Sequence, residues 1–202
     1  MSIVAETNAA ISDDPQILQD IRHPACQLAI WQRPLSFDPS PLINGQVDNL
    51  RLLVPADNPA PALIAALRSG GFSPGEALNA LVQDVSRLCE LFRPIANTAN
   101  IDIRVEIVTG DACRKFHGDY VSARLITTYT GPGTQWLDAD DAERVANGLE
   151  PLDIHQMRAG DVGIFKGRLS TDRPAIHRSP PIEGTGQARL VTVLNPEPEN
   201  RD

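Results

Sequence analysis

The hydrophobic period of the chain changes close to residue 100, and this change limits the folds that are open to it. Apolar residues from Leu78 to Phe92 recur at steps of three and four, which is the period of an amphipathic helix with one buried stripe. We expect this helix to end near Arg93, because Pro94 follows. Residues 101–107 then alternate between apolar and charged, which is typical of a half-buried strand. The helix needs a sheet face on which to bury its stripe, so we expect an α+β protein.

The chain divides into four parts on this basis. We expect 1–15 to be a disordered tail and 16–100 to be a mainly helical part that packs on the sheet. Residues 101–195 are expected to form the strand-rich core, and 196–202 a second loose tail.

The C-terminal half contains a series of short strands separated by turns at intervals of roughly 10 residues. This spacing predicts an antiparallel barrel or jelly roll. The strands are expected over 101–107, 120–129, 160–166, 174–181 and 188–194.

Composition and charge argue against several classes of function. The formal net charge of −8 and the pI near 4.9 argue against a nucleic-acid binder, which needs a basic footprint. No apolar run approaches the roughly 20 residues that cross a bilayer, and the N-terminus lacks a secretory signal. Three cysteines at irregular spacing do not predict a disulfide framework, so we expect a cytoplasmic protein with reduced thiols. Small molecules and proteins both stay open as substrates, and so does the oligomeric state.

The stretch Cys-Arg-Lys-Phe-His-Gly-Asp (113–119) carries the strongest chemical signal. On an extended backbone His117 and Asp119 face the same side, and Cys113 shares that side if the strand begins early enough. One imidazole and one carboxylate are two thirds of a 2-His-1-carboxylate metal site. A third ligand is available downstream from His155, in an irregular segment, or from His177, in an extended one.

The order of elements around these residues resembles the iron(II)- and 2-oxoglutarate-dependent dioxygenases. The shared series is strand, His-x-Asp, turn, Gly-Asp-strand, His, turn and a strand that begins with Arg. The resemblance implies a double-stranded β-helix (jelly-roll or cupin-like) core supported by the N-terminal helices. It implies iron(II) bound by His117, Asp119 and His177, with Arg189 as the anchor for the far carboxylate of 2-oxoglutarate. Tyr129 would add a hydroxyl to the same carboxylate.

Chemistry agrees with this ligand set. Two imidazoles and a carboxylate leave adjacent positions of an octahedral iron(II) open for a chelating keto acid. A guanidinium stays charged and binds a carboxylate in a bidentate fashion. The chain departs from the family pattern at Val191, where a small hydroxyl residue often stands two positions after the Arg.

Other readings of the same residues stay open. Cys113 with His117 and His177, with or without Asp119, would form a zinc site in a cupin-like protein that is not an oxygenase. His117 and Asp119 would otherwise form a plain hydrogen-bonded pair. Arg189 is as well suited to pair with a protein acid such as Asp119 or Glu183 as with a substrate.

The whole chain also resembles a bacterial family that carries a domain-of-unknown-function label. Three phrases carry this resemblance, namely 113–119, Thr-Tyr-Thr-Gly-Pro-Gly-Thr-Gln-Trp-Leu (128–137) and His-Arg-Ser-Pro-Pro (177–181). The resemblance implies a loose link to zinc limitation, which favours a metal without choosing which one.

Overall fold

A large mixed sheet dominates the computed structural model, which describes residues 8–198. Within that range the sheet has seven strands, in the spatial order β1 (Ala9–Ser12), β2 (Leu28–Trp31), β8 (Val162–Lys166), β5 (Ala123–Thr130), β10 (Arg189–Pro196), β4 (Asn100–Val108) and β3 (Leu50–Pro55). A small sheet has the order β7 (His155–Gln156), β6 (Gln135–Trp136) and β9 (His177–Arg178). All pairs are antiparallel except β1 with β2, which is parallel.

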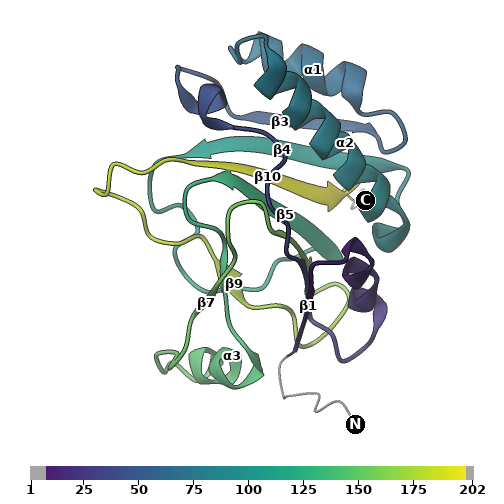
Figure 1. Cartoon of the computed structure of the whole chain (residues 1–202). Coiled ribbons are helices and arrows are strands. Elements are labelled where there is room, and N and C mark those ends of the chain that lie inside the picture. The colour runs from purple at the N-terminus through teal and green to yellow at the C-terminus, as the bar shows by residue number, and fades with distance from the viewer. Residues whose placement is uncertain (1–7, 199–202) are drawn as a thin grey trace.

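Helices cover one face of the large sheet, and the small sheet lies on the other side (Figure 1). The helical elements are η1 (Pro15–Arg22), η2 (Ser40–Ile43), α1 (Ala60–Ser69), α2 (Glu76–Ala96) and α3 (Ala139–Ala146). The stripe predicted for α2 is buried and packs on β10 and β4. Helix α3 lies beyond the small sheet and away from α1 and α2 (Figure 1).

The alternation of side chains along the strands divides the core into two clusters. Leu125, Leu190 and Leu194 belong to the larger cluster, which includes the stripe of α2. Ile126 and Val191, one residue away on the same strands, point the other way and belong to a smaller cluster. We call the side of the large sheet that carries this smaller cluster the small-sheet face. Residues on that face are the ones that can line a site between the two sheets.

The N-terminal part differs from its prediction. Ala9–Ser12 were expected within a tail but form β1, which pairs with β2 at the edge of the large sheet. The part over 16–100 contains η1, η2, α1 and α2, and it also supplies β2 and β3 to the same sheet as the C-terminal strands. β1 was not predicted because its four residues are too few to show the alternation of apolar and polar residues that indicates a strand. Residues 1–7 and 199–202, also expected in tails, lie outside the described residues.

Helix α2 also extends beyond its expected end. Pro94 lies inside the helix, which continues to Ala96 and ends at Asn97 in the left-handed conformation. A proline in the last turn removes one backbone hydrogen bond, whose acceptor is the carbonyl of the exposed residue Glu90. Because water can satisfy that carbonyl, the helix tolerates the proline. None of the helices within residues 8–198 has the length and apolar character needed to span a bilayer.

The stability of the fold should depend on the contact between α2 and the sheet. Phe92 is fully buried in the larger cluster, so Phe92→Ala should lower the free energy of unfolding by about 3–5 kcal/mol. Glu90→Ala, on the exposed side of the same helix, should change it by less than about 0.5 kcal/mol. Urea unfolding of the two variants beside the wild type measures both values. Equal effects of the two substitutions would contradict this packing of α2.

Candidate metal centre

A pair of backbone hydrogen bonds joins the two histidines that the sequence singled out. The amide of His117 donates to the carbonyl of His177 at 3.0 Å, and the amide of His177 donates back at 3.0 Å. The strand expected over 120–129 begins only at Ala123, as β5, and residues 111–116 form turns and bends. A single antiparallel bridge therefore fixes the two histidines side by side, without a continuous strand.

Three ligand-type side chains converge at this bridge. Single ligand atoms of His117, Asp119 and His177 all lie within 4.8 Å of one another. Nε2 of His177 is 3.2 Å from Oδ2 of Asp119, and Nε2 of His117 is 3.6 Å from Oδ1. Asp119 and His177 are buried, and His117 is half-buried at the edge of the group. The structure thus brings together the three residues of the expected facial triad.

Backbone carbonyls orient both imidazoles. Nδ1 of His117 is 2.9 Å from the carbonyl oxygen of Lys115, and Nδ1 of His177 is 3.1 Å from that of Ala175. Because a carbonyl only accepts, each Nδ1 carries the proton, and in the neutral ring Nε2 is left with its lone pair. Both lone pairs then face the carboxylate of Asp119. This is how histidine ligands of metals are commonly held.

The carboxylate of Asp119 sits in a strongly charged environment. Nη1 of Arg124 donates to Oδ1, while Oδ2 is buried and accepts no hydrogen bond in the described chain. Burial alone would raise the pKa of Asp119, but His117, His177 and the charge of Arg124 together hold that pKa well below its ordinary value. In turn, Asp119 raises the pKa of His117. Asp119 is therefore an anion whose second oxygen faces the imidazole of His177.

This donor set fits a divalent metal ion. Two imidazole nitrogens and a buried carboxylate oxygen point at one another, and neutral rings supply no proton to place between them. Such an arrangement is repulsive unless a cation lies between the three atoms or the rings are protonated. Imidazole and carboxylate together suit iron(II), and they also suit zinc.

Arg189 lies on the small-sheet face, and one of its partners, Ser179, stands two residues after His177. The side chain is almost completely buried, and its guanidinium donates to three neutral oxygens: the carbonyl of Pro132 at 2.7 Å, Oγ of Ser179 at 2.9 Å and Oγ1 of Thr128 at 3.3 Å. Among residues 8–198 no acid pairs with it, so neither Asp119 nor Glu183 is its partner. Burial lowers the pKa of Arg189 to about 10. A buried charge without a counterion is costly, which makes this position a candidate anion site.

The expectation for Tyr129 is corrected by the structure. Its hydroxyl donates to Oδ2 of Asp84 at 2.7 Å, and Asp84 is also bound by Arg33. Tyr129 belongs to the larger core cluster, on the helix side of the sheet. Because neighbours on a strand point to opposite sides, Thr128 faces Arg189 in its place.

Cys113 does not join the group of ligands within the described chain. It is exposed, and its backbone is in the left-handed region with φ of 57°. The turn there replaces the extended strand on which a shared face with His117 depended. His155 also lies elsewhere, with its ring stacked on Trp136 at 4.2 Å between centroids.

Sequence reasoning did not identify four polar residues that shape the site. Arg124 binds Asp119 and donates through Nε to Asn195, while Thr128 and Ser179 surround the guanidinium of Arg189. The position two after Arg189 is Val191, which packs in the smaller cluster without a hydroxyl, as expected. Thr128 of β5 and Ser179, the residue after β9, supply hydroxyls to Arg189 instead. The sequence does contain a sign of Arg124, which stands two residues before Ile126 on the strand that follows Asp119 and so shares its face.

A family model covers most of the chain. Residues 12–195 match the family described as "Protein of unknown function (DUF1826)". The chain belongs to this family. The resemblance expected from the three sequence phrases is thereby confirmed. A search of curated proteins gave no match.

Several solved structures resemble this family member at low sequence identity. A putative oxygenase from Shewanella oneidensis is 13% identical, with 94% of this chain and 90% of that chain covered and a TM-score of 0.49. A prolyl-4-hydroxylase from Pseudomonas putida is 8% identical, with 91% and 99% covered and a TM-score of 0.46. Neurospora crassa T7H in complex with alpha-KG and 5-formyluracil is 10% identical, with 93% and 79% covered and a TM-score of 0.46. With TM-scores below 0.5, these similarities do not by themselves define the fold or the activity of this chain.

Metal binding should depend on both bridged histidines. His117→Ala and His177→Ala each remove one nitrogen donor, so protein reconstituted with iron(II) or zinc should retain only background metal after desalting. His155→Ala is the matched control, because that ring lies outside the group, and it should retain the metal of the wild type. Metal analysis by mass spectrometry measures the outcome. Wild-type metal content in all three variants would rule out the triad.

Gly118, which stands between His117 and Asp119, should be needed to keep His177 in place. A Cβ at Gly118 would lie 2.6 Å from Cγ of Pro174, in the rigid segment that leads to His177. Gly118→Ala should therefore shift that segment and weaken metal binding by about 10- to 100-fold, as displaced supports of metal ligands do. Gly110→Ala is the control, because a Cβ there meets nothing within 4 Å. Competition with a chelator compares the two affinities, and equal values would show that the segment adapts.

Proposed function

We propose that this protein is an iron(II)- and 2-oxoglutarate-dependent oxygenase whose C-terminal strands form a double-stranded β-helix core. The observation that carries the proposal is the buried guanidinium of Arg189, which has no acid partner in the described chain and donates to Ser179, two residues after the ligand-type residue His177. A metal site alone does not need such a charge. A metal site that also takes a dicarboxylate does.

The spacing of the two features supports a ligand that reaches both. Ser179, whose hydroxyl contacts Arg189, stands two residues after His177, so their Cα atoms are about 6.6 Å apart on an extended backbone. A five-carbon keto acid has a comparable length, with a chelating group at one end and a carboxylate at the other. Ser179 and Thr128 would add hydroxyl donors beside the guanidinium.

Each group of residues would have a separate role. His117, Asp119 and His177 would hold the metal ion, and Arg124 would keep the carboxylate of Asp119 in place through Oδ1. Bound iron(II) with 2-oxoglutarate supplies the capacity to activate oxygen, which no side chain provides. The ring of Phe165 lies 4.5 Å from that of His177 and would exclude water from that side.

The proposal predicts a spectroscopic change that depends on Arg189. Anaerobic addition of iron(II) and 2-oxoglutarate to the wild type should give a weak visible charge-transfer band. Arg189→Met should keep the metal but weaken 2-oxoglutarate binding by about 30-fold or more, the factor that a loss of 2 kcal/mol gives. Arg178→Met is the control, because that side chain contacts Gln135 and the ring of Phe116, neither of which binds Arg189. Titration of the band measures both affinities.

The opposite results have clear meanings. Iron-loaded wild type without the band would remove the 2-oxoglutarate assignment. Zinc in the native protein, held by the same three ligands and indifferent to 2-oxoglutarate, would identify a cupin-like metal protein without oxygenase activity. An equal loss of 2-oxoglutarate affinity in the Arg178 and Arg189 variants would show that the change in the band reflects general damage to the protein.

A further inference from the structure

Lys166 is unusual in this chain. Only two of the 18 basic residues in the sequence are lysines, and the other lysine, Lys115, is exposed. Lys166 ends β8 and is 9% exposed. An ammonium is more strongly hydrated than a guanidinium, so its burial needs a compensating partner.

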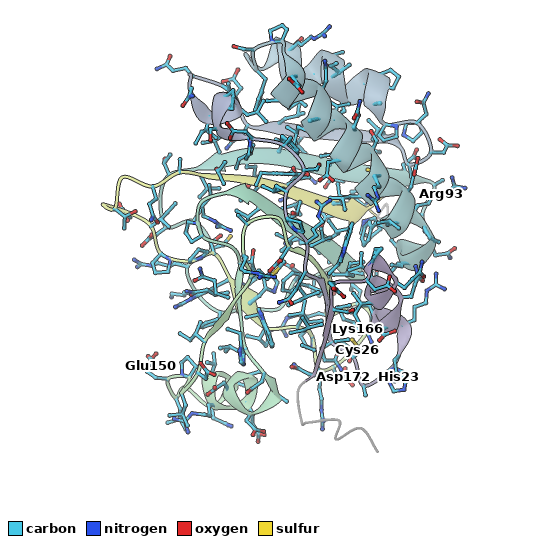
Figure 2. The ribbon with its side chains drawn as sticks, viewed as in Figure 1. His23, Cys26, Arg93, Glu150, Lys166 and Asp172 are labelled. Atoms are coloured by element: carbon cyan, nitrogen blue, oxygen red, sulfur yellow. The ribbon has the colours of Figure 1, made fainter. Side chains whose placement is uncertain are left out.

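The structure supplies Lys166 with little compensation. Its Nζ donates to the carbonyl of His23 at 2.8 Å, and Cys26 is the one nearby group that favours its charge. Lys166, His23 and Cys26 lie together beside η1 (Figure 2). Asp172 is drawn in the same region, but no acid of residues 8–198 forms an ion pair with Lys166. Burial therefore lowers the pKa of Lys166.

Lys166 lines a cleft of about 420 Å³, a size that suits a small organic ligand. The polar residues that line the cleft include Ser122, Ser170 and Thr171. Arg22 also lines the cleft, but its guanidinium donates to the carbonyl of Pro94 at 2.7 Å.

The rest of the wall is apolar. Ile21 of η1 and Ile95 and Ala96 of α2 line it, together with Ala123 of β5. These residues belong to the larger core cluster or pack against it, on the helix side of the large sheet. The candidate metal centre lies on the other face, where the ring of His177 contacts Phe165. The cleft is therefore a separate site.

We propose that this cleft binds a small monocarboxylic acid with an apolar body, whose carboxylate pairs with the ammonium of Lys166. The ammonium of Lys166 has no acid partner among residues 8–198, so a carboxylate would supply the negative charge that it lacks. The hydroxyls of Ser122 and Thr171 provide further donors for its oxygens, and the side chains of Ile21 and Ile95 cover its apolar part. The claim does not depend on the proposed oxygenase activity.

Benzoate is a suitable probe because it has one carboxylate and one apolar ring. Saturable binding of benzoate to the full-length protein should appear in calorimetry. In nuclear magnetic resonance spectra it should shift the backbone amides of Ser122 and Thr171. Lys166→Met should weaken the affinity at least tenfold, because the apolar side chain keeps the bulk but loses the charge. Lys166→Arg should recover most of it.

Two further variants keep the test decisive if Lys166→Met fails to fold. Ala96→Phe should fill the apolar end of the cleft and reduce benzoate binding at least tenfold, while Lys166 stays intact. His177→Ala should bind benzoate as the wild type does, which separates this cleft from the candidate metal centre. The proposal is overturned if wild-type protein does not bind benzoate, if binding survives in both cleft variants, or if binding is lost in His177→Ala.

Discussion

The candidate centre depends on one interaction, the contact of the Asp119 carboxylate with two imidazoles and a guanidinium. Oδ1 is bound by Arg124, and Oδ2 lies 3.2 Å from Nε2 of His177 without a hydrogen bond. Backbone carbonyls fix the proton of each imidazole on the far side of the ring. The carboxylate is thus held ionised and directed toward two lone pairs, an arrangement that a cation stabilises.

The large sheet separates this chemistry from the rest of the protein. Side chains that alternate along β5 and β10 point either to the helices or to the small sheet. Thr128 contacts Arg189 on the small-sheet face, whereas Tyr129 is bound to Asp84 on the helix side. Two adjacent residues of β5 therefore have different roles. The hydroxyl of Thr128 contacts Arg189, and that of Tyr129 binds Asp84 of α2. The same division places the Lys166 cleft on the face opposite the metal ligands.

Local sequence carried the information for some parts of the fold and not for others. The stripe of α2 and the alternation in β4 are local periods, and both elements lie where these periods predict them. The order His-x-Asp and His likewise identified the three residues that converge, although a turn at Cys113 precedes His117. The bridge between His117 and His177 joins segments 60 residues apart, and no local period encodes such a contact. The predicted direction of the Tyr129 side chain is wrong. Which side chains of β5 point to the small sheet depends on the pairing of β5 with β8 and β10, which local sequence does not encode. The placement of β1 depends in the same way on its pairing with β2 at the sheet edge.

Charge balance links the two halves of the proposed site. Arg124 and Asp119 compensate each other, which leaves Arg189 as a positive charge without an acid partner in the described chain. A divalent metal ion would add two positive charges there, and a dicarboxylate would remove two. Each ligand therefore lowers the electrostatic cost of burying the other, and by linkage the two must raise each other's affinity equally. Binding of the dicarboxylate would also reverse the effect that burial has on the pKa of Arg189, because the new anion favours the charged guanidinium. On this account the buried arginine is not a defect of packing, since its guanidinium gains a direct anionic partner when the dicarboxylate binds.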